Sequence, residues 1–189
     1  DVPRMSLFKV SILAFVVSFV GFTAKAGSIS WKEVLDQPKY SVFFLRHALA
    51  PGYGDPPDFN IDNCKTQRNL NTEGKDQATF IGTDLKNIGI SFDKIYSSEW
   101  CRCTETASLI NIGEVTTFPG LNSFFQDHYD REETLGKLLN KLEGIDKTSR
   151  VLMVTHQVVI SAITGINVAS GVAVAYNPRD GSSVKISTR

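Results

Sequence analysis

The chain has 189 residues, of which 42% are hydrophobic and 10% aromatic, and its 20 basic and 20 acidic side chains balance to a net charge of zero. This length and apolar fraction suit a single globular domain. The even charge argues against a nucleic-acid partner, because such a surface needs a basic excess or stripe.

Residues 1–26 have the layout of a secretory signal peptide. Basic side chains precede an apolar run over residues 10–24, and small residues stand at the −3 and −1 positions of a cleavage site after Ala26. The alternative, a membrane anchor, would need roughly 20 apolar residues, and the run is shorter. We therefore expect a secreted or periplasmic protein of a bacterial cell, no membrane span after cleavage, and a single domain over residues 27–189. The residues before Met5 receive no role.

An oxidising compartment would allow a disulfide bond among the three cysteines. Cys103 shares a predicted helical face with apolar residues, so we expect it to be packed, whereas Cys101 lies on a more polar face. The sequence therefore favours a bond between Cys64 and Cys101. A Cys-x-Cys spacing without further paired ligands is weak evidence for a metal site, and no metal is expected.

Apolar runs that end in polar residues alternate with helical patterns along the chain. The run at residues 42–45 ends in Arg46 and His47, as in a strand buried on both faces of a parallel sheet, and residues 150–155 repeat this pattern before His156. Strands that alternate with helices predict a three-layer α/β/α domain with a mostly parallel central sheet. The other predicted elements are strands at residues 94–97, 115–118, 172–176 and 183–187 and helices at about 72–88, 99–111, 131–142 and 157–164.

Two of the three histidines, His47 and His156, directly follow predicted buried strands. The carboxyl ends of parallel strands share one edge, where open α/β folds bind ligands, so both imidazoles should face one crevice. Arg102 lies just past another strand end, near the start of a helix that Ser98 is predicted to cap, and both features favour an anion. Together with Arg46, these side chains suit a phosphoryl group better than a carboxylate or a sugar.

Four segments, in order, resemble the motifs of the histidine phosphatase superfamily, which has the phosphoglycerate-mutase-like fold. The resemblance extends over about residues 42–165, which is most of the predicted domain. The segments are residues 45–48 (LRHA), 70–74 (LNTEG), 97–107 (SSEWCRCTETA) and 154–156 (VTH).

The resemblance implies that His47 is a nucleophile that is transiently phosphorylated on a ring nitrogen. It also implies that Arg46, Arg102 and His156 hold the phosphoryl oxygens. No cofactor or metal is implied, because the arginines supply the positive charge that phosphoryl transfer needs. The expected partner is a small molecule that carries a phosphate.

The proton donor is where the sequence departs from the family. Many members carry Leu-x-Glu after the third strand, but residues 121–123 read LNS, and Gln157 rather than an aspartate follows the second histidine. The irregular segment 121–130 occupies the place where members bring a lid over the site. Its Asp127 and His128 are therefore the candidates for a general acid and a substrate contact.

Several residues near the predicted site keep two interpretations. Arg68 either contacts the phosphate or substrate, or forms a salt bridge that fixes the loop after the first strand. Four aromatic residues either line an apolar rim for the substrate or pack the loops. They are Phe59, Phe124, Phe125 and Tyr129.

The sequence supports two functions of different classes. The first is an exported phosphatase that acts on phosphomonoesters or phosphoramidates. The second is a non-catalytic protein that binds a phospho-ligand, a hypothesis motivated by the missing acid. A mutase is less favoured, because the chain is short and export would remove it from the phosphorylated metabolites of the cytoplasm.

Overall fold

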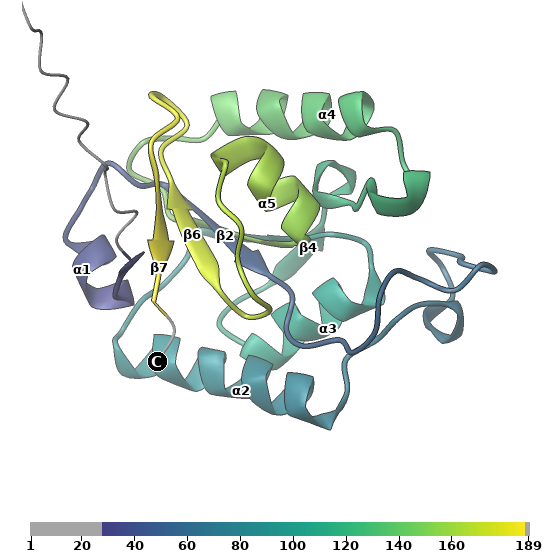
Figure 1. Cartoon of the computed structure of the whole chain (residues 1–189). Coiled ribbons are helices and arrows are strands. Elements are labelled where there is room, and N and C mark those ends of the chain that lie inside the picture. Colours follow the sequence, from purple (N-terminus) through teal and green to yellow (C-terminus); the bar gives the residue numbers. More distant parts are fainter. Residues whose placement is uncertain (1–27, 188–189) are drawn as a thin grey trace, which may run out of the picture.

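The computed structural model describes residues 28–187, which form one seven-stranded sheet between two layers of helices (Figure 1). The predicted signal peptide at residues 1–26 lies outside the described residues. None of the helices within residues 28–187 is long and apolar enough to cross a membrane. The strands are β1 Ser28–Ile29, β2 Val42–Arg46, β3 Lys94–Ser97, β4 Val115–Thr117, β5 Val151–Thr155, β6 Ala173–Tyr176 and β7 Ser183–Ile186. The helices are α1 Trp31–Leu35, α2 Thr72–Asn87, α3 Cys101–Ile110, α4 Arg131–Glu143 and α5 Gln157–Thr164, with short 3-10 turns η1 Cys64–Thr66, η2 Pro119–Leu121 and η3 Phe125–Asp127.

The strands follow the order β1-β7-β6-β2-β5-β3-β4 across the sheet. β2, β5, β3 and β4 are parallel neighbours, whereas β6 pairs antiparallel with both β2 and β7. The C-terminal hairpin expected from the sequence is β6 and β7. The short strand β1, which the sequence does not predict, extends the sheet beside β7. The predicted three-layer α/β/α fold with a mostly parallel sheet is confirmed.

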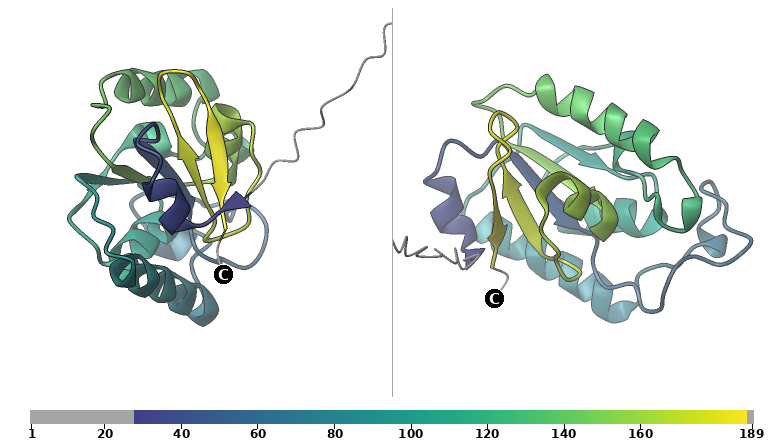
Figure 2. Two further views of the ribbon diagram at one scale, coloured as in Figure 1. Left: turned by 90° about the vertical axis from the view of Figure 1, so that its left-hand side faces the viewer. Right: turned by 45° about the horizontal axis from the view of Figure 1, so that its top comes forward.

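The side chains of β2 alternate between the two faces of the sheet. Phe43 and Leu45 pack in the cluster formed with α1, α2 and α3, and Val42 and Phe44 pack in the cluster formed with α4 and α5. Figure 2 shows α2 and α4 on opposite sides of the sheet. Each of the four side chains is at most 1% exposed. Because both faces of β2 are covered, its sequence is continuously apolar instead of alternating.

Two glycines of α2 let other backbone segments approach the helix closely. A Cβ at Gly82 would clash with the carbonyl of Ile110, the last residue of α3. A Cβ at Gly74 would clash with the carbonyl of Leu49, in the loop that follows β2. Only glycine fits at such contacts. The two glycines therefore set the positions of α3 and of the loop after β2.

Candidate active site

The two histidines lie together at the carboxyl edge of the sheet. β2 and β5 are hydrogen-bonded neighbours, and His47 and His156 directly follow them. The imidazole centroids are 5.5 Å apart, and the residues are 2% and 3% exposed. Both side chains line a cavity of about 380 Å³, together with Arg46, Arg68 and Arg102. The structure thus brings the predicted histidines and arginines into one cavity.

The hydrogen bond of His47 assigns its tautomer. Nδ1 lies 2.7 Å from the carbonyl oxygen of Ala48, which only accepts, so Nδ1 carries the proton and Nε2 keeps its lone pair. Burial, followed by the nearby charge of Arg102, lowers the pKa of His47 to about 3. The ring is therefore neutral at ordinary pH, in the form that acts as a nucleophile.

His156 has the opposite tautomer. Its Nδ1 lies 3.4 Å from Nη2 of Arg102, which only donates, so Nε2 carries the proton and donates to Oγ of Ser98 at 2.9 Å. The Ser98 hydroxyl in turn donates to Oδ1 of Asn122 at 3.1 Å. Burial and the charge of Arg102 hold the pKa of His156 well below its usual value. His156 therefore turns a neutral acceptor nitrogen toward the guanidinium.

The predicted role of Ser98 as the helix cap is wrong. α3 begins at Cys101 with Trp100 at the N-cap position, and the Trp100 side chain makes no capping hydrogen bond. The Ser98 hydroxyl instead accepts from the Trp100 amide at 3.3 Å and joins the chain of hydrogen bonds from His156 to Asn122. Arg102 remains in the first turn of the helix, as predicted.

Asp55 is the main site residue that the sequence analysis missed. Its carboxylate accepts two hydrogen bonds from Arg102, at 2.7 and 3.1 Å, one from Nε1 of Trp100 at 3.1 Å and one from the amide of Arg68 at 2.9 Å. Both side chains of the ion pair are 4% exposed. Burial raises the pKa of the Asp55 carboxyl, but the hydrogen bonds and charge of Arg102 outweigh it and hold that pKa below its usual value. Asp55 is therefore an ionised anchor for Arg102.

Backbone oxygens hold the guanidinium groups of Arg46 and Arg68, whereas the Asp55 carboxylate holds that of Arg102. Arg46 donates from Nη1 to the carbonyl of Val168 at 2.8 Å, and Arg68 donates from Nε to that of Gly54 at 2.9 Å and from Nη1 to that of Ala50. Among residues 28–187, the Nε–H groups of Arg46 and Arg102 are buried and have no acceptor. A buried donor without an acceptor is costly. Both arginines also line the cavity, where their guanidinium groups would favour an anion.

The two candidates from the irregular segment lie away from this cavity. Asp127 is exposed in η3, and His128 packs against Phe59, with ring centroids 4.2 Å apart. Neither residue lines the cavity, and within residues 28–187 no aspartate or glutamate does. The structure therefore does not bring Asp127 or His128 to the place where a general acid or a substrate contact would act.

The aromatic residues near the site divide into two groups. Phe59 stacks on Trp100 with centroids 4.9 Å apart, and Tyr129 lies 5.4 Å from Trp100, so both pack the loops. Phe124 packs at the edge of the core cluster beside α4 and α5. Phe125 alone of the four lines the cavity, where it contacts Tyr53.

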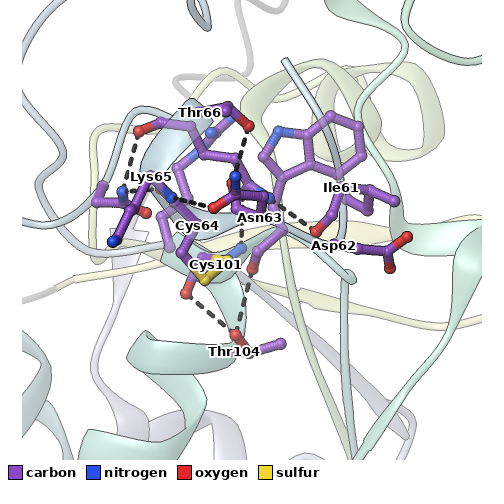
Figure 3. The surroundings of a disulfide bond; sticks show 12 residues. Ile61, Asp62, Asn63, Cys64, Lys65, Thr66, Cys101 and Thr104 are labelled. Atoms are coloured by element: carbon purple, nitrogen blue, oxygen red, sulfur yellow. Dashed lines mark hydrogen bonds between the residues drawn. A yellow bond between two sulfur atoms is a disulfide. The ribbon is translucent and has the colours of Figure 1, made fainter. Parts of the chain in front are cut away.

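A disulfide bond joins Cys64 in η1 to Cys101, the first residue of α3 (Figure 3). The bond ties the long loop after β2 to the residue next to Arg102. The amide of Cys101 also donates to Oε1 of Gln67 at 2.9 Å, which adds a second link between the loop and the helix. Cys103 is a buried free thiol, and burial raises its pKa to about 12.

No metal site is apparent in the described part of the chain, since residues 28–187 contain no cluster of three or more His, Cys, Asp or Glu side chains able to hold an ion. The positive charge of the cavity comes from its arginines. Guanidinium groups are suited to stabilise the negative charge of a phosphoryl group.

The sequence model of one protein family, the histidine phosphatase superfamily (branch 1), matches residues 42–134. The chain belongs to the histidine phosphatase superfamily. The match covers β2, the loop after it and the helix that carries Arg102. Membership of this superfamily supports a phosphatase or mutase activity on a phosphate-bearing substrate. No curated protein sequence matches the chain.

Several solved structures share the fold of this chain. The protein histidine phosphatase SixA complexed with tungstate is 18% identical, with a TM-score of 0.51 over 76% of this chain and 92% of that one. An alpha-ribazole phosphatase from Shigella flexneri is 16% identical, with a TM-score of 0.52 over 78% and 98%. A phosphoserine phosphatase from Entamoeba histolytica is 19% identical, with a TM-score of 0.51 over 77% and 94%. These likenesses show the fold.

Proposed function

We propose that the protein is an exported phosphatase that hydrolyses phosphomonoesters or phosphoramidates through a phosphohistidine on His47. The observation that carries the proposal is the state of the His47 ring. The ring is neutral, and its proton is fixed on Nδ1 by the carbonyl of Ala48, which leaves the Nε2 lone pair available. A neutral imidazole in a cavity lined by guanidinium groups is a nucleophile beside an anion site.

In the first step, the Nε2 lone pair of His47 forms a bond to phosphorus while the bond from phosphorus to the leaving oxygen or nitrogen breaks. The leaving group departs with the electron pair of that bond. Positive charge that develops on the ring is stabilised by the hydrogen bond from Nδ1 to Ala48. The guanidinium groups of Arg46 and Arg102 would hold the phosphoryl oxygens, with Arg68 adding a third charge.

In the second step, water attacks the phosphorus of the phosphohistidine. The bond from phosphorus to Nε2 breaks, inorganic phosphate is released and His47 regains its lone pair. His156 lines the same cavity and directs its acceptor nitrogen to Arg102. Its position supports a role in orienting that guanidinium, and direct contact with the phosphoryl oxygens stays a prediction.

The composition of the cavity wall favours particular leaving groups. Within the described residues no carboxylate lines the cavity, and the nearest buried one, Asp55, is held ionised by its donors. A strongly basic alkoxide would need a proton as it departs. The proposed substrates therefore carry leaving groups that are stable as anions, as in acyl and aryl phosphates, or a leaving nitrogen that is already protonated in the substrate, as in phosphoramidates.

A series of phosphate compounds with graded leaving-group basicity tests the proposal. We expect the purified, oxidised protein to hydrolyse acetyl phosphate and phosphoramidate much faster than glycerol phosphate. The variant His47→Ala should lose activity by roughly four orders of magnitude or more. Calorimetry with inorganic phosphate provides the control, because His47→Ala keeps the three arginines and should still bind the anion.

The absence of a carboxylate from the cavity wall in the described residues also favours a second candidate, a non-catalytic protein that binds a phospho-ligand. The same experiment separates the two functions. If wild type and His47→Ala bind phosphate equally well and neither turns over any of the compounds, the protein is a binding protein and the phosphatase proposal fails.

Export is supported by two independent features. The sequence of residues 1–26 has the layout of a signal peptide, and Cys64 and Cys101 form a disulfide bond of the kind that persists in oxidising compartments. Expression in a bacterial host followed by fractionation tests this part of the proposal. We expect periplasmic protein that begins at Gly27. Full-length protein in the cytoplasm with three free thiols would contradict it.

A further inference from the structure

The cavity is lined by both polar and apolar side chains. Three arginines, two histidines, Gln157 and two serines are polar, whereas the other large side chains of the lining are apolar or aromatic. The apolar set is Leu49, Pro51, Tyr53, Phe125 and Val158. Because the phosphoryl group would be held by the arginines, the rest of the substrate would lie against this apolar set.

Tyr53 and Phe125 form an aromatic pair within the apolar set. Their ring centroids are 5.2 Å apart and their planes are 86° apart, an edge-to-face contact. Tyr53 is 87% exposed, the most exposed large hydrophobic residue in the described part of the chain. A large ring left in water beside a cavity is a feature that ligand binding would remove, because burying such a ring is favourable.

The contact between Tyr53 and Phe125 is not needed to hold the loop after β2 against η3, because other contacts do so. Oε1 of Gln126 accepts from the amide of Asp55 at 2.7 Å, and Nε2 of Gln126 donates to the carbonyl of Asp55 at 3.4 Å. Gly54, which has φ of +68°, leaves room for the Gln126 amide where a Cβ would clash with it. These backbone contacts already fix the loop after β2 against η3. Because Gly54 and Gln126 hold the two segments together, the rings of Tyr53 and Phe125 remain free to contact a ligand.

We propose that Tyr53 and Phe125 form a subsite for an aromatic leaving group. This inference rests on the proposed function and deepens it, because it names the substrate class as phosphate compounds whose leaving group contains a planar ring. A third ring that packs against this pair would add favourable aromatic contacts, and such contacts contribute to the binding free energy beyond the area that they bury. Aryl and aroyl leaving groups also depart without a proton, in agreement with the lining of the cavity.

Three acyl phosphates separate the effect of an aromatic ring on kcat/KM from the effect of leaving-group basicity. Acetyl, cyclohexanecarbonyl and benzoyl phosphate all release carboxylates, so they need no general acid. For wild type we expect kcat/KM for benzoyl phosphate to exceed that for acetyl phosphate by about tenfold, with cyclohexanecarbonyl phosphate between them. Tyr53→Ala and Phe125→Ala should each bring the ratio close to one, whereas Tyr53→Phe, which keeps the ring, should preserve it.

Phe80→Ala is the matched control, since Phe80 is an exposed aromatic residue of α2 outside the cavity lining. It should leave the ratio unchanged. A ratio that stays near tenfold in both Tyr53→Ala and Phe125→Ala, or a wild-type ratio near one, would overturn the subsite.

A binding measurement keeps this inference separate from catalysis. Phenylphosphonate and methylphosphonate cannot be hydrolysed, so their dissociation constants, measured by calorimetry, do not depend on turnover. We expect wild type to bind phenylphosphonate about tenfold more tightly than methylphosphonate and Tyr53→Ala to lose that preference. If turnover is absent but this preference is present, the phosphatase proposal fails and the aromatic subsite stands. Equal affinity for the two phosphonates would remove the subsite.

Discussion

Replacement of Asp55 by alanine tests the electrostatic structure of the cavity. The change removes four hydrogen bonds, two of them from Arg102, and leaves that guanidinium buried without its counter-ion. Both partners are 4% exposed, so solvent would not replace the lost interaction. Breaking a buried pair by removing one partner lowers the free energy of unfolding by about 3–5 kcal/mol, and we expect a loss in this range.

Chemical denaturation with urea measures this loss, and the same loop supplies a matched control. Asp58 is an exposed carboxylate of that loop, and Asp58→Ala should change the free energy of unfolding by no more than about 0.5 kcal/mol. Activity should fall as well, because an unanchored Arg102 no longer holds its guanidinium group in place at the cavity. We expect kcat/KM of Asp55→Ala to drop by roughly a hundredfold.

A double-mutant cycle decides whether Asp55 acts through Arg102. The variant that carries both Asp55→Ala and Arg102→Ala should be less destabilised than the sum of the single variants, by about 1–3 kcal/mol. Additive effects, or a loss of less than about 1 kcal/mol in the free energy of unfolding of Asp55→Ala, would contradict the role of Asp55 as the anchor of Arg102.

Three further predictions concern stability. Replacing Cys64 and Cys101, which are 37 positions apart, by serine should lower the free energy of unfolding by about 4 kcal/mol in urea titrations, and a loss below about 1 kcal/mol would contradict the loop-closure estimate. Gly82→Ala should lower the free energy of unfolding by more than about 2 kcal/mol, because its Cβ would clash with α3. Gly136→Ala, at an open position of α4, should raise that free energy by about 0.5–1 kcal/mol. Equal effects would show that α2 and α3 do not pack as described. Burial lowers the pKa of His47 from 6.5 in the unfolded chain to about 3 in the folded protein. Between pH 6.5 and pH 3 the unfolded chain therefore binds a proton on this ring that the folded protein does not bind. The contribution of His47 to stability is complete above pH 6.5 and is lost as the pH falls towards 3. This histidine should contribute a slope of about 1.4 kcal/mol per pH unit between pH 6 and 4, and a slope that is unchanged in His47→Gln would be inconsistent with that pKa.

The fold could be predicted because its signals are local. β2 and β5 are continuously apolar since both of their faces are buried, and the polar residues that follow them mark the edge where ligands bind. The first turn of α3 likewise placed Arg102 near that edge. The positions of the histidines and arginines in the cavity follow from these strand ends and helix starts.

The remaining contacts depend on how distant segments meet. Asp55 and Arg102 are 47 positions apart, and nothing in the Pro- and Gly-rich loop distinguishes Asp55 from its exposed neighbour Asp58. Ser98 has the residue type and position of a helix cap, but the nearby His156 ring engages its hydroxyl. Asp127 was favoured because of its place in the chain, whereas the turn of η3 leaves it in solvent.

Trapping of the phosphoenzyme is a direct test of His47 as the nucleophile. The protein is mixed with labelled acetyl phosphate, quenched within a single turnover, and examined for a covalent phosphate that is labile in acid and stable in base. We expect wild type to carry this phosphate on His47 and His47→Ala to carry none. Failure of wild type to become labelled, or equal labelling of His47→Ala, would contradict a phosphohistidine at this position.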